Sequence, residues 1–345
     1  MLNKYTGIFD VAYTTRQLHW NLQGYQSTST FDIDLLTIHC YNDAIIERKE
    51  ERSMNELKLI GFKEQHLHSM QDYLNALQMI LDINKKTNHL ERQVAPIVAD
   101  WPDQLFIRKA LAHLHAQGLQ SAISQEIESF IPILGPLHLS LNSREHVIII
   151  YHSFFEQMFH FVFGERKKLA KKPKPWRINL LLELARNGWI KIKNEIMKKF
   201  GSTCKDVEYQ MAIDLLDNLI PATLDIYAIL FRSGSSEQYV ETVFRIWTFA
   251  LRWKRKNYNK APLVFLSDLF YWQDNHHPFA DAVKKYLPCF NDYYVENTHS
   301  RIRANTSSNA TAENIIKQAY VIGIYALTYY IEINKLFLTL YILSK

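Results

Sequence analysis

The chain has 345 residues, 48% of them hydrophobic and 13% aromatic, and a formal net charge of +5. This composition excludes a disordered protein, and the length suits about two domains or one domain with a large insertion. Glycine and proline are sparse, with 10 of each, which favours long helices over a turn-rich β-sandwich. The three cysteines lack zinc-binding spacing and fit a reducing intracellular compartment.

Residues 1–142 mix short β-rich runs with amphipathic stretches, so we expect an α/β arrangement there. The expected strands are 35–41, 57–62, 95–99 and 130–139. The expected helices are 4–22, a second that is capped by Ser69 and ends near Ile83, and a third that starts at Pro102.

The pattern of hydrophobic residues changes over residues 143–285. Long aromatic segments there have a helical period and predict an all-helical insertion. The expected helices there are 144–163, 176–199, 206–231 and 236–256. Pro221 is expected to break or kink the third of them. Residues 286–318 then predict a helix that carries Glu296, and an apolar tail follows at 319–345.

The stretch 319–343 is long enough for a membrane span, but Glu332, Asn334 and Lys335 lie inside it. We therefore favour a helix packed on the core, or a tail from an altered gene end, over a membrane anchor.

Asp100 follows the apolar run 95–99 and is the first candidate metal ligand. A strand end is rigid and opens to solvent, which suits a metal-binding carboxylate. The alternative is an aspartate at a helix N-terminus, because Pro102 starts a helix that favours negative charge there.

Glu296 is the second candidate, in the segment YVENTHSRIR. Glu296, His299, Ser300 and Arg303 share one helical face. Two carboxylates such as Asp100 and Glu296 could together hold a divalent metal for phosphoryl-transfer chemistry. The alternative is a solvated helix with a Glu–His or Glu–Arg pair.

Two basic segments are candidates for nucleic-acid contact. Residues 166–177 carry Lys167 and Lys168 in a stretch free of acids, and residues 252–260 interleave Lys254 and Arg255 with aromatic side chains. Basic charge attracts phosphate, and aromatic rings can stack on bases. The first segment is also typical of a nuclear-import signal, and the second of a frayed helix end.

Several segments, among them VADWPDQLFIRKAL, KKPKPWRINLLLELAR and YVENTHSRIRANTSSNATAENI, resemble a family of uncharacterised, transposon-derived fungal proteins. More broadly, the layout is similar to DDE-type transposases. The resemblance covers roughly 33–320. It implies an α/β fold with an RNase H-like mixed sheet core, interrupted by a large all-α insertion and predominantly helical overall.

The resemblance further implies that Asp100 and Glu296 are catalytic residues that bind two Mg²⁺ or Mn²⁺ ions for DNA strand cleavage and transfer. Arg301 and Arg303 would then face DNA, as would Lys167, Lys168, Lys254 and Arg255. The implied setting is the nucleus, with the cytoplasm as the alternative. A homo-oligomer is compatible with the family.

The family pattern expects a third catalytic residue, an aspartate on a first strand, which this chain does not place. That strand is expected to precede Met1 in the parent element, and Asp10 and Asp34 are possible substitutes. The alternative function is therefore a truncated, non-catalytic remnant that binds DNA or another protein.

Overall fold

The computed structural model describes residues 62–88, 90–91, 93–118, 123–293, 295–296, 299, 302, 305–307, 309–318 and 341–343. The chain divides into two compact units. The described part of one is 136–289, the helical unit; the other, the sheet unit, combines residues 62–135 with the described residues from 290 onward. The expected elements at 4–22 and 35–41, and Asp10 and Asp34, lie outside the described residues.

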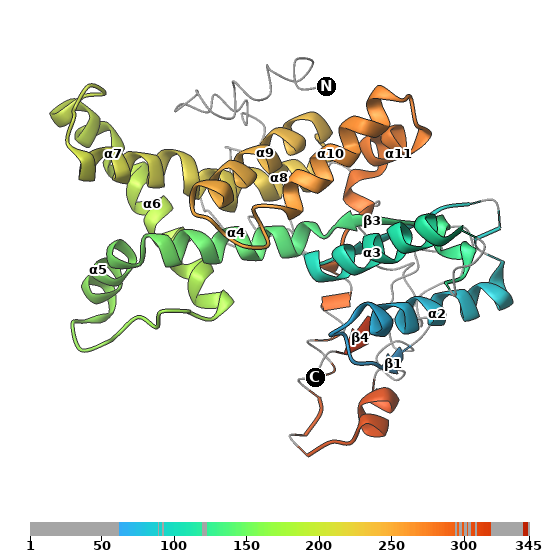
Figure 1. The fold of residues 1–345 in the computed structure, drawn as a ribbon. Coiled ribbons are helices and arrows are strands. Elements are labelled where there is room, and N and C mark those ends of the chain that lie inside the picture. Colours follow the sequence, from blue (N-terminus) through green and yellow to red (C-terminus); the bar gives the residue numbers. More distant parts are fainter. Residues whose placement is uncertain are drawn as a thin grey trace. The chain divides into compact units, whose positions relative to one another are not determined.

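Helices make up most of the described chain, as the sequence predicts (Figure 1). The sheet unit contains β1 (Phe62–Glu64), α2 (Met70–Thr87), β2 (Ala95–Ala99), α3 (Trp101–Gln117), the 3₁₀ turn η5 (Gln125–Ser129), β3 (Phe130–Leu134) and β4 (Tyr341–Leu343). Strand β1 pairs in parallel with β4, and β2 in parallel with β3. The predicted strand 57–62 overlaps β1 only at Phe62, and residues 57–61 lie outside the described ranges.

A capping box starts helix α2, because the Ser69 hydroxyl accepts from the backbone N–H of Asp72 while the Asp72 carboxylate accepts from that of Ser69. The predicted cap is therefore confirmed, and the helix runs four residues past Ile83. Its buried face packs on α3 and the strands through Leu77, Ile80, Leu81, Ile107 and Phe130. This small core fixes α3 and the β2–β3 pair, and so fixes where β2 ends.

The prediction of a single strand over 130–139 is wrong. Strand β3 ends at Leu134, and Pro136 begins helix α4. Proline suits the first turn of a helix because the N–H that it lacks would have no partner there. Gly135 alone forms the junction between β3 and α4.

The described residues of the helical unit form helices and the irregular connections between them. The helices are α4 (Pro136–Ile150), α5 (His152–Phe163), α6 (Pro175–Phe200), α7 (Val207–Ile213), the π-helices η6 (Asp214–Leu219) and η7 (Pro221–Ile226), α8 (Tyr227–Ser233), α9 (Ser236–Arg252), α10 (Ala261–Asp274), α11 (Pro278–Tyr286) and the 3₁₀ turn η8 (Leu287–Cys289). A core of α4, α5, α6 and the π-helices includes Val147, Phe155, Leu181 and Leu219.

One of the helix predictions for this unit is wrong. The segment 144–163 is interrupted at Tyr151, whose ring packs edge-on against Trp253 and whose backbone leaves the helical region at φ −102° and ψ 32°. At Pro221, where the sequence predicts a break or a kink, the helix continues. Ile220 stays helical at φ −65° and ψ −50°, and the helix widens to π geometry on both sides. In a π-helix the backbone bonds shift by one residue, which accommodates a residue without an N–H.

No helix among the described residues combines the length and apolar character needed to cross a membrane. The apolar tail at 319–343 lies outside the described residues except for strand β4.

His146 on α4 makes the stability of the helical unit depend on pH. Burial, together with the charge of Arg255, lowers the pKa of His146 to about 4. The unfolded histidine titrates near 6.5, so between these values the unfolded chain binds more protons, and stability is lost as pH falls. We expect the free energy of unfolding to drop by about 2 kcal/mol between pH 7 and pH 5.

Urea denaturation at the two pH values measures this drop, with His146→Phe as the comparison. Phenylalanine can keep the edge-on ring contact that His146 makes with Tyr258 and cannot titrate. The variant should lose most of the pH dependence over this range. An equal drop in wild type and variant would contradict the assignment to His146.

Candidate metal centre

Asp100 lies at the point where β2 ends and α3 begins, as the sequence predicts. Its carboxylate Oδ1 accepts a hydrogen bond from the backbone N–H of Trp101 at 2.6 Å, and the residue is half-buried. The alternative interpretation, that Asp100 lies at a helix N-terminus, is therefore confirmed. A carboxylate has several lone-pair positions, so the bond from Trp101 does not by itself exclude a metal ion.

A second aspartate, Asp292, lies against the end of the neighbouring strand. The Gly135 N–H donates to the Ala99 carbonyl at 2.8 Å, which ties the end of β3 to the end of β2. A Cβ atom added at Gly135 would overlap Oδ2 of Asp292 and lie 2.8 Å from its Cγ and 3.0 Å from the Ala99 oxygen. The Asp292 carboxylate thus occupies the space that a side chain at position 135 would need.

Glu296 follows Asp292 by one helical turn. The Glu296 N–H faces the Asp292 carbonyl at 3.5 Å, and Tyr293, Val295, Glu296, His299 and Ile302 are helical. Glu296 is half-buried, whereas Asp292 is only 4% exposed. Residues four apart share a helical face, so the two carboxylates belong to the same side of this segment.

The hydrogen bond between Gly135 and Ala99 relates the two predicted ligands, Asp100 and Glu296. Asp100 directly follows Ala99 in the sequence. Glu296 lies one helical turn after Asp292, whose carboxylate packs against Gly135. Sequence reasoning missed Asp292. Its position four residues before Glu296 was the available signal, because it puts a second carboxylate on the face of Glu296.

Gln104, one turn after Asp100, adds a buried polar atom to this region. Its side chain is fully buried, and its Nε2 donates to the Ala99 carbonyl at 3.3 Å. Its Oε1 accepts no hydrogen bond within the described structure. A buried acceptor without a donor is unfavourable by about 1–3 kcal/mol, so a water molecule, such as one bound to a metal, would stabilise it.

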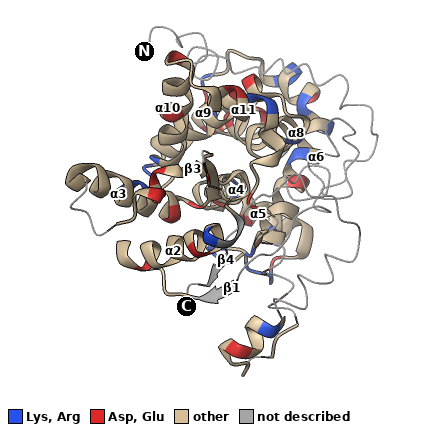
Figure 2. Cartoon of the chain, turned by 90° about the vertical axis from the view of Figure 1, so that its right-hand side faces the viewer, with Lys and Arg blue, Asp and Glu red and all other residues tan. Residues whose placement is uncertain are grey.

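Helix α2 contributes a tyrosine beside the start of α3. Burial raises the pKa of Tyr73, and so does its hydrogen bond to the Asp103 carboxylate, with a smaller effect of Asp100. The Tyr73 hydroxyl therefore keeps its proton and donates to Asp103. The ring of Tyr73 also stacks on Phe106 at 4.5 Å. Asp103 also lies in the first turn of α3, where the helix dipole favours a negative charge. Figure 2 shows the acidic positions on α2 and α3 in red.

The donor set suits a hard cation. Carboxylate oxygens are the ligands that Mg²⁺ and Mn²⁺ prefer, and Mg²⁺ is commonly held by one or two carboxylates together with waters and substrate phosphates. Asp100, Asp292 and Glu296 could supply such oxygens. No group of three or more His, Cys, Asp or Glu side chains is already arranged to hold a metal in the described residues. Substrate phosphate would have to complete the coordination.

The structure describes four of the six residues that are predicted to contact DNA. Arg301 and Arg303 lie outside the described residues. Lys167 and Lys168 are exposed in the connection between α5 and α6. Lys254 is exposed at a turn with φ 53°, and Arg255 is half-buried near His146.

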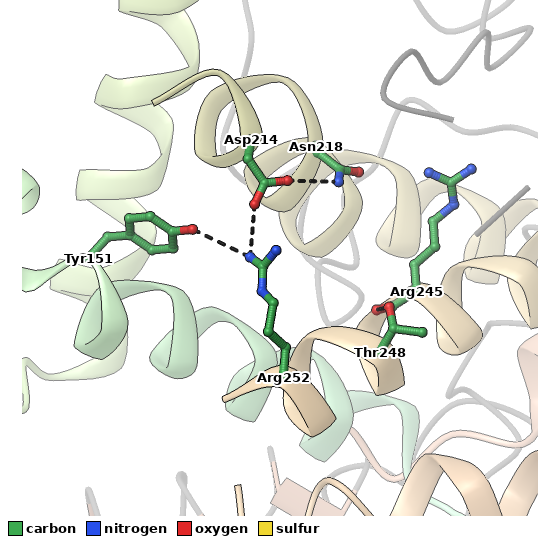
Figure 3. Close-up of polar contacts among 6 residues, drawn as sticks. All are labelled: Tyr151, Asp214, Asn218, Arg245, Thr248 and Arg252. Carbon is green, nitrogen blue, oxygen red and sulfur yellow. Dashed lines mark hydrogen bonds and ion pairs between the residues drawn. The ribbon is translucent and has the colours of Figure 1, made fainter. Parts of the chain in front are cut away.

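The aromatic residues of segment 252–260 are not a free stacking surface. Tyr258 is buried, and its hydroxyl accepts from Asn142 at 2.8 Å. Trp253 stacks on Phe249 at 5.9 Å. Arg252 reaches across to Asp214 at 2.8 Å and Tyr151 at 3.5 Å, so its guanidinium is held by the protein (Figure 3).

The helical unit also has a pocket of about 490 Å³ between α9, α10 and α11, which sequence reasoning did not find. Its apolar lining includes Phe265 and Leu269. Its charges are paired within the protein, since Glu241 bonds the buried Arg245 at 2.8 Å and Glu237 bonds Lys284 at 3.0 Å. These pairings leave the pocket poorly suited to metal or phosphate chemistry.

No protein-family model, curated protein or solved structure matches this chain.

Proposed function

We propose that this chain derives from a DDE-type transposase and performs metal-dependent cleavage and transfer of DNA strands in the nucleus. The observation that carries the proposal is the contact between the Asp292 carboxylate and Gly135, next to Asp100 at the end of a parallel strand pair. It brings an acidic residue from beyond the helical unit in sequence to the strand end that Asp100 follows.

The arrangement of the sheet unit supports an RNase H-like core. Strands β2 and β3 are parallel and joined by α3, and Asp100 directly follows β2. The chain then leaves the sheet unit for the helical residues 136–289 and returns at Phe290. A sheet domain interrupted by a helical insertion, with acidic residues before and after it, is the layout that the resemblance implies.

Each side chain has a defined role in this proposal. Asp100 and Glu296 are the metal ligands, with Asp292 as a further carboxylate from the same turn, and Gln104 orients bound water. Mg²⁺ or Mn²⁺ would polarise the phosphodiester and activate a water or a 3′-hydroxyl for attack.

Binding of Mn²⁺ to the purified chain tests the proposal. Asp100→Asn and Glu296→Gln should each weaken Mn²⁺ binding by at least about tenfold, since changing even a residue that merely orients a metal ligand has such an effect. Glu313→Gln is the matched control, because Glu313 is exposed and its one ion pair within the described part of the chain is with Lys317, at 2.8 Å. Unchanged Mn²⁺ affinity in both Asp100→Asn and Glu296→Gln would sink the proposal.

A second candidate is a DNA-binding or protein-interaction scaffold without catalysis. The absence of a ready three-ligand group in the described residues favours it, as does the engagement of Asp100 in capping α3. In the same preparation, salt-dependent DNA binding without any Mn²⁺ affinity would select this candidate.

A further inference from the structure

Helices α5 and α6 are joined by a basic connection that is fixed to the helical unit. From Gly164 to Arg177 the chain has seven Lys and Arg residues and one acid, Glu165. Leu169 is buried in the core and Pro173 is also buried. A ring nitrogen of His152 lies 3.3 Å from the Ala170 carbonyl. These contacts anchor the connection to the helical unit at Leu169 and Ala170, and Figure 1 shows it as the loop between α5 and α6.

The lysines on either side of Leu169 point to solvent. Lys167, Lys168, Lys171, Lys172 and Lys174 are all exposed. None of them makes an ion pair with a carboxylate of the described residues. Exposed basic side chains that make no ion pair within the described structure are available to an anionic partner.

Two exposed aromatic rings adjoin these lysines. Trp176 is 58% exposed and Phe163 is 41% exposed. The Arg177 guanidinium lies 4.7 Å from the ring centroid of Trp176 and 5.5 Å from that of Phe159. The ring of Phe159 in turn lies 4.7 Å from that of Phe163. We call Phe163, Trp176 and Arg177 the aromatic strip.

The aromatic strip and the lysines together match one ligand chemistry. Bases stack on aromatic rings and guanidinium planes, while lysines follow the phosphate backbone. Rings can stack only on bases that are unpaired, so duplex DNA would use the lysines alone. A lipid surface is a poorer match, because membrane-surface binding generally uses an amphipathic helix and these lysines lie on a non-helical connection.

We propose that the α5–α6 connection and the aromatic strip bind single-stranded nucleic acid, with unpaired bases stacked on Trp176 and Phe163. This surface belongs to the helical unit, whereas the candidate metal ligands belong to the sheet unit, so the inference goes beyond the proposed function. Binding is measured in EDTA, so failure of the metal centre leaves it standing.

The test uses fluorescence anisotropy of the full chain with a labelled oligothymidylate, an oligouridylate and a DNA duplex of equal length. Trp176→Ala should weaken binding of the single strands by roughly five- to 150-fold, the range for removal of one stacked base. Trp176→Phe should restore most of the affinity, because the ring is kept. Replacing both Lys171 and Lys172 by alanine should reduce the salt slope by about 1.4.

Phe161→Ala is the matched control. Phe161 is 92% exposed on the same helix, but two residues before Phe163 and so about 200° around it. The proposal predicts unchanged single-strand affinity in this variant. Preference for either the DNA or the RNA strand over the duplex supports the proposal.

Equal losses in Phe161→Ala and Trp176→Ala would overturn the proposal, as would wild-type affinity of Trp176→Ala for both strands. Sedimentation with anionic phospholipid vesicles tests the lipid alternative. Vesicle binding that depends on Trp176, together with strand binding that does not, would overturn it as well.

Discussion

Replacing Gly135 by alanine should lower the free energy of unfolding of the sheet unit by about 3 kcal/mol. The added Cβ would occupy the position of Oδ2 of Asp292 and lie 3.0 Å from the Ala99 carbonyl. Forcing an extra carbon into a packed site is unfavourable by about 1–3 kcal/mol, and displacing a buried carboxylate from its surroundings adds to this. Urea denaturation followed by circular dichroism measures the change.

Gly188→Ala provides the control for this substitution. Gly188 lies within α6, and a Cβ there would meet no atom within 4 Å. Alanine favours a helix interior over glycine by about 1 kcal/mol, so this variant should be more stable than wild type. If Gly135→Ala were as stable as wild type, Asp292 would not be packed against residue 135 as described.

Asp292→Asn should reduce Mn²⁺-dependent nicking of labelled DNA by about 100-fold or more. Asparagine keeps the shape of the side chain but removes the negative charge that would hold the metal, and changing a residue that only orients a metal ligand already has effects of 10–100-fold. Because the change is nearly isosteric, the fold and DNA binding should persist. Asp281→Asn, at an exposed aspartate in the first turn of α11, is the control and should nick as wild type.

The two outcomes of this experiment separate the functions clearly. Loss of nicking with DNA binding retained would place Asp292 in the catalytic centre. Full nicking by Asp292→Asn would remove Asp292 from the site and leave its contact with Gly135 as packing alone.

Local signals in the sequence predicted several elements well. Ser69 marked the start of α2, and the helical period over 176–199 matches α6 to within one residue at each end. The apolar run before Asp100 predicted β2 and the place of Asp100 at its end. Each of these depends on interactions within a few residues, which a sequence displays directly.

Features that depend on distant residues could not be predicted. The interruption at Tyr151 follows from its packing against Trp253, which lies far along the chain. Tyr258 looked like a stacking residue, but Asn142 and the core enclose it. The contact of Gly135 with Asp292 joins two residues that precede and follow the helical unit in the sequence. Only the folded chain shows such pairs.

Anomalous diffraction from crystals soaked in Mn²⁺ would test the metal centre most directly. We expect an anomalous peak about 2.1 Å from carboxylate oxygens of Asp100 and of Asp292 or Glu296, near the ends of β2 and β3. A well-ordered crystal with no peak at these carboxylates, or with Mn²⁺ bound only elsewhere, would contradict the proposed site.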